Sequence, residues 1–132
     1  MPSITGAHHA ALTVTDADRS AQWYSDLLGL VVLMSGDEDD VRFRVLAHPD
    51  SGWVLGLRQY PKARDGAFDE FRTGLDHFAF GVASRAELDG WARELAARGV
   101  TCSPIKETPI GTVITFRDPD NIQLELWLPL NA

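Results

Sequence analysis

The chain has 132 residues, with 19 acidic and 12 basic side chains and a formal net charge of −7. A surface this acidic repels phosphate backbones and anionic lipids, which argues against nucleic acid and membrane partners. No apolar run approaches the roughly 20 residues that span a bilayer, and the N-terminus lacks the layout of a secretory signal. The lone cysteine, Cys102, cannot form an intramolecular disulfide. We therefore expect a soluble protein of the reducing cytoplasm.

The sequence contains two similar copies of one segment, because residues 6–30 align with residues 74–100. Further on, residues 48–57 pair with residues 118–127 at an offset of 70. Ordered similarity of this kind indicates a duplicated structural module. The matches at an offset of 68 are Gly6 with Gly74, His9 with His77, Val14 with Val82, Trp23 with Trp91 and Leu27 with Leu95.

The first copy predicts a strand, a helix and three further strands. Asp16 stands at a helix N-cap position, and Gly29 is a natural helix end because glycine adopts the left-handed conformation at little cost. The acidic run at 37–40 lacks the alternating ligands and the glycine of a calcium loop, so it indicates a solvated turn. The predicted strands are 7–14, 30–35, 41–47 and 53–59.

The second copy repeats this plan, with Ser84 at the helix N-cap and Gly99 at the helix end. Its predicted strands are 75–82, 100–103, 111–117 and 122–128. We therefore expect one α+β domain over residues 1–132. It consists of two tandem βαβββ modules, at about 5–60 and 74–130, and a linker at about 61–73, which either only joins the modules or also covers a pocket.

Alternation along the strands separates candidate site residues from the core. In each opening strand the bulky apolar side chains share one face, so His9 and His77 lie on the other, among small residues. Glu125 interrupts an apolar strand, which costs free energy unless its charge is compensated, as it would be by a divalent cation. One interpretation is three separate half-buried polar residues, with Glu125 paired to an arginine such as Arg58. The repeat-related histidines favour a shared metal site.

A second set of residues predicts an apolar wall beside this site. Strand parity from the offset of 70 assigns residues 53, 55 and 57 to the face that carries Glu125 in the second copy, and assigns Arg58 to the opposite face. Such a wall suits an aromatic or extended apolar ligand. The predicted pocket residues are Trp53, Leu55, Leu57, Tyr60, Phe68 and Trp127.

Three motifs carry a family resemblance: the opening HHAALTVTDADRSAQWYSDLLGL, the repeat DHFAFGV and the closing FRDPDNIQLELW. Together they resemble the vicinal oxygen chelate superfamily, which includes glyoxalase I, fosfomycin-resistance enzymes, extradiol dioxygenases and bleomycin-resistance proteins. Asn121 replaces the glycine of the family's Asp-Pro-Asp-Gly signature, a mild departure because asparagine tolerates a left-handed turn.

The resemblance implies curved mixed sheets around a cleft, in a chain that pairs as a homodimer. It also implies one divalent ion, of Fe, Mn, Zn or Ni, on His9, His77 and Glu125, with His9 of one chain meeting the other two ligands in its partner or in its own chain.

Comparison with individual members of the superfamily argues against several of their activities for this chain. Glyoxalase I and methylmalonyl-CoA epimerase use a fourth protein ligand on the first-module strand, where residues 55–57 offer none. Fosfomycin enzymes have a threonine two residues after the first histidine, where this chain has Ala11. Extradiol dioxygenases resemble the three-ligand set best, but they carry a tyrosine at the position of Thr115.

Two functions follow from these observations. The first is a metal-dependent lyase or dioxygenase of this superfamily, in which the ion chelates two adjacent oxygens of a small, apolar or partly aromatic substrate or activates dioxygen. The second is a resistance protein of the bleomycin type that sequesters a drug or natural product without turnover. The retained metal ligands favour the enzyme.

Overall fold

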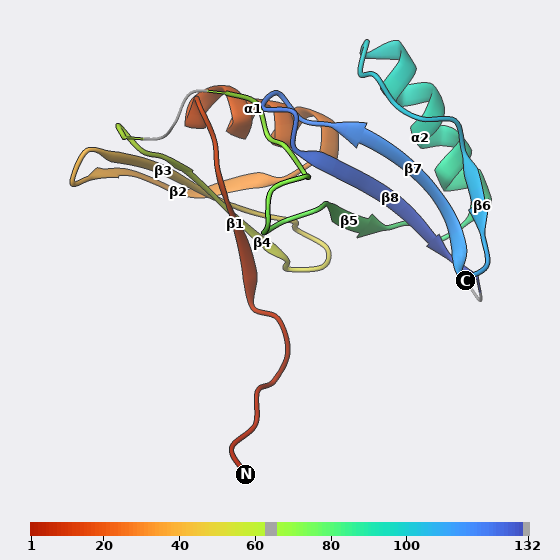
Figure 1. Cartoon of the computed structure of the whole chain (residues 1–132), viewed down its shortest axis with the longest axis horizontal. Helices are drawn as coiled ribbons and strands as arrows, with labels where there is room; N and C mark the ends of the chain where they lie inside the picture. Colours follow the sequence, from red (N-terminus) through yellow and green to blue (C-terminus); the bar gives the residue numbers. More distant parts are fainter. Residues whose placement is uncertain (63–65, 131–132) are drawn as a thin grey trace. The chain divides into compact units, whose positions relative to one another are not determined.

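The computed structural model describes residues 1–62 and 66–130 and divides the chain into two compact units, Met1–Asp65 and Gly66–Ala132. Each unit contains one helix and a four-stranded mixed sheet in the order βαβββ, which confirms the predicted α+β class and the repeated module (Figure 1). Among the helices of the described residues, none is long and apolar enough to cross a membrane.

The first unit has the sheet order β1-β4-β3-β2, in which β1 runs parallel to β4 and the remaining neighbours are antiparallel. Helix α1 contacts β2, β3 and β4 on one face of this sheet, and the described residues of this unit contain no helix for the other face. The elements are β1 (His9–Thr13), α1 (Ala17–Leu28), β2 (Val31–Glu38), β3 (Val41–Ala47) and β4 (Val54–Gln59).

The ends of α1 follow the predicted signals. The Asp16 side chain accepts a hydrogen bond of 3.0 Å from the Arg19 backbone N–H, so it caps the first turn. At the other end Gly29 has φ 70° and donates its N–H to the Ser25 carbonyl. Tyr24, fully buried, is the largest side chain on the face that packs against the sheet.

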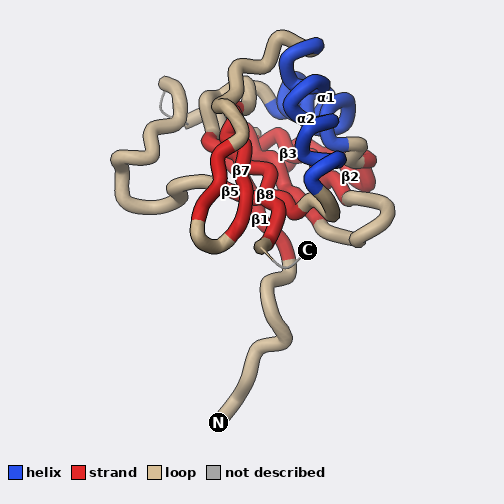
Figure 2. The backbone as a smooth tube through the Cα atoms, turned by 90° about the vertical axis from the view of Figure 1, so that its right-hand side faces the viewer, coloured by secondary structure: helices blue, strands red, loops and turns tan. Residues whose placement is uncertain are grey.

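The second unit repeats this topology with the sheet order β5-β8-β7-β6. Ser84 caps α2 through a bond of 3.2 Å from the Glu87 N–H, and Gly99 follows the helix with φ 70°, as predicted. Figure 2 distinguishes the helices from the strands by colour. The elements are β5 (Phe78–Gly81), α2 (Arg85–Ala97), β6 (Lys106–Thr108), β7 (Gly111–Arg117) and β8 (Gln123–Pro129).

The strand predicted at 100–103 is wrong. Residues 100–103 contribute one isolated bridge, between Cys102 and Phe116, and the edge strand β6 forms later, at Lys106–Thr108. Pro104 has no N–H to donate, which prevents continuous pairing between the two segments.

The acidic run forms the predicted turn, although β2 is longer than expected and includes its first two residues. Asp39 and Asp40 have φ of 52° and 64°, the left-handed pair typical of a tight hairpin turn. Asp37, in β2, accepts a hydrogen bond of 3.2 Å from Arg42 across the hairpin.

Burial confirms the predicted faces of β1 and β8 but contradicts that of β4. Leu55 and Leu57 are 1% and 0% exposed, because they pair with Ala10 and Leu12 on the face that α1 covers. The face assigned to these positions is therefore wrong, although Leu57 still lines a hollow in this unit. Trp53 precedes the strand.

The β4 face was predicted wrongly because the assumed alignment of β4 with β8 is shifted by one residue. Ala11 pairs with Gly56 in the first unit, and its counterpart Ala79 pairs with Glu125 in the second. Gly56, not Leu55, is therefore the structural counterpart of Glu125. By the same register Arg58 pairs with Thr13, on the face that carries His9, and not on the opposite face as predicted.

Candidate functional site

His77 and Glu125 lie next to each other in the second unit. His77 immediately precedes β5, and Glu125, in β8, pairs with Ala79, two residues after His77. The distance from His77 Nε2 to Glu125 Oε2 is 3.4 Å, and the glutamate side chain is 16% exposed. The sheet thus holds an imidazole nitrogen and a largely buried carboxylate at the distance at which a shared cation or proton would join them.

Asp76 fixes the orientation of this imidazole. Its Oδ1 lies 2.7 Å from His77 Nδ1, and an ionised carboxylate can only accept, so Nδ1 carries the proton. In the neutral ring the Nε2 lone pair then points toward Glu125. A carboxylate on the far nitrogen is the usual support of a metal-binding histidine. Asp76 was not among the predicted site residues, although the Asp-His pair is visible in the sequence.

Two further side chains complete the surroundings of the pair. The Gln123 amide donates to the backbone carbonyl of Asp76 at 3.1 Å and to its Oδ1 at 3.2 Å, which positions that carboxylate. Thr115 Oγ1, paired with Glu125 across β7 and β8, lies 3.5 Å from Glu125 Oε1. Both residues were missed as support, because their role depends on cross-strand neighbours.

An ion pair joins the segment before β5 to the same sheet. Arg117 donates to both carboxylate oxygens of Glu70, at 3.1 and 3.0 Å, and to Gln123 Oε1 at 3.0 Å. Hydrogen bonding to the Arg117 guanidinium lowers the pKa of Glu70 from 4.5 to about 2. Asn121, with φ 65°, donates its amide to the Phe68 carbonyl at 3.0 Å, so the left-handed turn expected there also holds this segment.

This ion pair predicts acid-dependent stability. Because the pKa of Glu70 is lower in the folded chain, its stabilisation is fully present above pH 4.5 and is lost as the pH falls toward 2. Glu70→Gln should therefore unfold at lower urea concentration than the wild type at neutral pH, and the difference should disappear at about pH 2. Urea titrations across this range measure it. A difference that persists unchanged at low pH would contradict the assignment.

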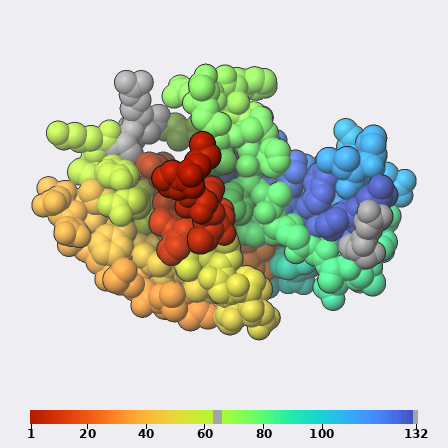
Figure 3. All heavy atoms as spheres, turned by 90° about the horizontal axis from the view of Figure 1, so that it is seen from below, coloured from red at the N-terminus to blue at the C-terminus, as the bar shows by residue number. Residues whose placement is uncertain are grey.

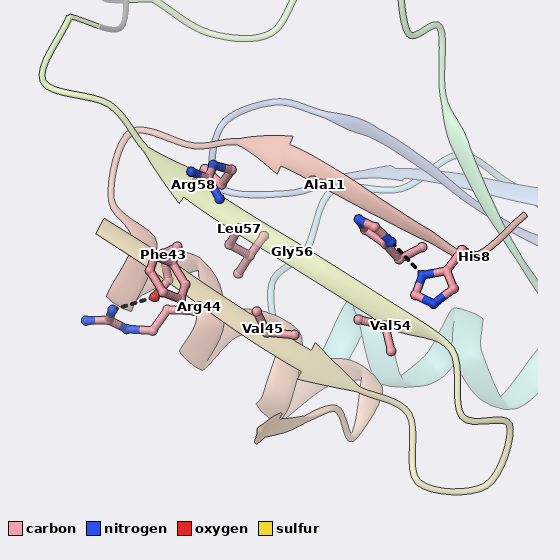
Figure 4. Close-up of a pocket in the computed structure, with 10 residues that line it drawn as sticks. His8, Ala11, Phe43, Arg44, Val45, Val54, Gly56, Leu57 and Arg58 are labelled. Carbon is pink, nitrogen blue, oxygen red and sulfur yellow. Dashed lines mark hydrogen bonds between the residues drawn. The ribbon is translucent and has the colours of Figure 1, made fainter. Parts of the chain in front are cut away.

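The predicted third ligand, His9, belongs to the first unit and lines a hollow of about 290 Å³ on the sheet face that bears no helix. The floor and sides are formed by side chains of β1, β3 and β4 (Figure 4). Residues 1–7, red in Figure 3, precede β1 and are exposed. The residues that line the hollow include His9, Ala11, Phe43, Val45, Gly56 and Arg58.

Strict alternation along a strand would place the His8 side chain on the opposite face from His9. Instead, the two side chains contact each other. His8 precedes β1, where alternation no longer applies, and its Nδ1 lies 2.8 Å from His9 Nδ1. The two rings meet edge to face at 5.0 Å between centroids. One nitrogen of His9 is therefore engaged by a neighbouring imidazole, and Nε2 is the nitrogen left to bind a ligand.

The remaining predicted pocket residues are divided between the two units. Tyr60 follows β4 and accepts a hydrogen bond of 2.9 Å from Arg58 Nε at its hydroxyl. Phe68 donates its N–H to the Asp120 carbonyl, and Trp127 shares the β8 face of Glu125. Within the described residues of each unit, no three His, Cys, Asp or Glu side chains form a group that could hold a metal ion.

Comparisons with known proteins agree with the fold. A model of the Glyoxalase/Bleomycin resistance protein/Dioxygenase superfamily matches residues 6–126. The solved glyoxylase/bleomycin resistance protein/dioxygenase domain from Frankia sp. EAN1pec is 38% identical, covers 96% of this chain and 99% of its own, and superposes with a TM-score of 0.89. The uncharacterized protein YwkD of Bacillus subtilis is 29% identical and covers 94% of this chain and 97% of its own.

A more distant solved structure carries a metal. A mutant of the fosfomycin resistance protein FosX from Listeria monocytogenes, complexed with Mn(II) and 1S,2S-dihydroxypropylphosphonic acid, is 20% identical to this chain. It covers 95% of this chain and 90% of its own, with a TM-score of 0.71. At this identity the likeness shows the fold alone.

Proposed function

Because this chain belongs to the glyoxalase/bleomycin resistance protein/dioxygenase superfamily, we propose that it is a divalent-metal-dependent enzyme whose metal ligands are His9, His77 and Glu125. The observation that carries the proposal is the His77–Glu125 pair, at 3.4 Å, with Asp76 on the far nitrogen of the ring. A neutral imidazole and a carboxylate that face each other with lone pairs repel, and a cation between them removes that repulsion.

The residues present fit a metal ion. Two imidazoles and one carboxylate are ligands of Fe, Mn, Zn and Ni, and they leave coordination positions open for substrate oxygens. A bound ion would act as a Lewis acid toward two adjacent oxygens or as a site for dioxygen. His9 would come from the first module of the same chain or of a second copy in a homodimer.

The chain's own side chains would have distinct tasks. Asp76 holds the Nδ1 proton of His77, so Nε2 stays available as a ligand. Thr115 approaches Glu125 Oε1 and limits its rotation. The apolar hollow beside His9 would exclude water from the bound substrate, which we expect to be a small, apolar or partly aromatic oxygenated molecule.

The direct test is the metal content of the protein. Preparations stripped with a chelator and then exposed separately to Fe(II), Mn(II), Zn(II) and Ni(II) should retain about one ion per chain for at least one of them, measured by elemental analysis after gel filtration. Turnover of vicinally oxygenated substrates is then sought with that ion. If none of the four ions remains at stoichiometric level, the metal-dependent enzyme is excluded.

Asp76→Asn provides a finer prediction. The amide keeps the shape of the side chain but can no longer hold the Nδ1 proton as a carboxylate does, so we expect metal affinity to fall by about 10- to 100-fold. Competition with a chromophoric chelator measures this change. Asp69→Asn is a matched control, because its carboxylate instead contacts Arg72 and Phe71 N–H. Equal affinities in the wild type and Asp76→Asn would show that the carboxylate does not support a ligand.

A sequestration protein remains the second candidate, because the hollow beside His9 is largely apolar. Tight binding of an aromatic drug by the metal-free protein, with the drug recovered unchanged, would distinguish a sequestration protein from the metal-dependent enzyme. Sedimentation of the chain at several concentrations would test the proposed homodimer in either case.

A further inference from the structure

Arg58 brings a positive charge to the largely apolar hollow of the first sheet, whose other arginine, Arg44, is paired with Asp18. Arg58 pairs with Thr13 of β1 and Phe43 of β3, so its side chain emerges on the same face as the hollow. The guanidinium carbon lies 5.9 Å from the Phe43 ring centroid and 5.6 Å from that of Tyr60. With Nε bonded to the Tyr60 hydroxyl, the two rings hold the group in place.

This arginine differs from its neighbours in having no acidic partner among residues 1–62 and 66–130 within ion-pairing distance. Arg44 contacts Asp18 at 2.7 Å, and Arg42 contacts Asp18 and Asp37 at 3.3 and 3.2 Å. With Nε on Tyr60, the Nη1 and Nη2 edge of Arg58 is the part that can take a bidentate ligand.

The hollow between Arg58 and His9 is shaped by small residues. Gly56 lies beside Ala11, and a Cβ at Gly56 would be 3.3 Å from the Ala11 Cβ. These two residues form the floor of the hollow, and no long side chain projects from it. Figure 4 shows Arg58 and His8 at opposite ends, with Val45 and Val54 along one side. Val54 pairs with His9 at one end of the hollow. Arg58 lies four positions after Val54 on β4, so the two ends of the hollow are about 13 Å apart along the strand.

We propose that this hollow binds an elongated carboxylate with an apolar or aromatic body. The carboxylate would take the Nη edge of Arg58, the body would lie on the Ala11–Gly56 floor, and the other end would reach His9. The inference rests on the proposed function in one respect only, because it makes the end near His9 the reacting end. Carboxylate recognition itself requires no metal.

A monoanion fits better than a phosphate. Arg58 supplies a single positive charge, the charges of Arg42 and Arg44 are matched by aspartates, and the whole chain carries a net charge of −7. A dianionic group would leave one negative charge unmatched beside an apolar surface, which is costly. A planar carboxylate also matches the fork of one guanidinium.

The test uses full-length protein freed of metal with a chelator, so it does not depend on the metal proposal. The probes are 4-phenylbutyrate and its neutral amide, with dissociation constants measured by calorimetry. We expect the carboxylate to bind at least tenfold more tightly than the amide. Arg58→Gln should remove this preference without changing amide binding, since a charged hydrogen bond is worth about tenfold or more in affinity. Arg42→Gln, on the opposite face, should bind both probes as the wild type does.

One further variant and three contrary outcomes complete the experiment. Gly56→Val fills the floor and should weaken both probes, with circular dichroism confirming that the variant is folded. Equal affinity for the acid and the amide, an unchanged preference in Arg58→Gln, or no saturable binding of 4-phenylbutyrate would each overturn the inference. Any of these results could coexist with stoichiometric metal on His77, so the two proposals fail separately.

Discussion

His77→Ala should abolish stoichiometric binding of the divalent ion. His77 is expected to supply one of only three protein ligands, and its Nε2 lies 3.4 Å from Glu125 Oε2. Losing one of three ligands leaves a carboxylate and one imidazole, which hold a divalent ion weakly. We therefore expect the affinity to fall by more than the roughly 100-fold upper range associated with a lost supporting residue. Elemental analysis after gel filtration measures the effect directly.

The control for this variant is His48→Ala. His48 lies in the turn before β4, where its Nδ1 contacts Ser51 Oγ at 2.8 Å, and it is not a proposed ligand. It should retain the wild-type metal content. The proposal is wrong if His77→Ala, shown to be folded by circular dichroism, keeps one ion per chain, or if both variants lose the ion equally.

The parts of the fold that were predicted correctly depend on short-range chemistry. Asp16 and Ser84 cap their helices because an oxygen three residues before a free N–H can reach it in any context. Gly29 and Gly99 end those helices because their φ of 70° is unfavourable for other residues. The module repeat then determines the topology, since each copy has the same order of local signals.

The parts that failed depend on register between distant segments. Aligning the two closing strands at an offset of 70 made Leu55 the counterpart of Glu125, whereas the parallel pairings make Gly56 its counterpart. One residue of shift exchanges the two faces of a strand. Because of the same shift, Arg58 was assigned from the sequence to the wrong face of β4. In the structure Arg58 lines the hollow. Nothing local in the sequence distinguishes these offsets.

The candidate site shows the same division. His77 and Glu125 were identified by their type and by strand parity, and the structure places them side by side. Asp76 was missed although it stands next to His77 in the sequence. Gln123 was missed because its contribution is a hydrogen bond from β8 to Asp76, which precedes β5. A residue that acts through a neighbour on another strand has no signature of its own in a single sequence.

Leu55→Ala should lower the free energy of unfolding by about 2–5 kcal/mol, because Leu55 is 1% exposed and its removal leaves a cavity under α1. A residue on the open wall, as first predicted, would cost much less. Val54→Ala is the matched control, since Val54 is only half-buried and lies on the face of His9, so its cost should be clearly smaller. Urea denaturation of both variants decides between the registers. If Val54→Ala were the more damaging change, the β4 strand would have to be shifted by one residue and the hollow, with Arg58, would lose its place on this face.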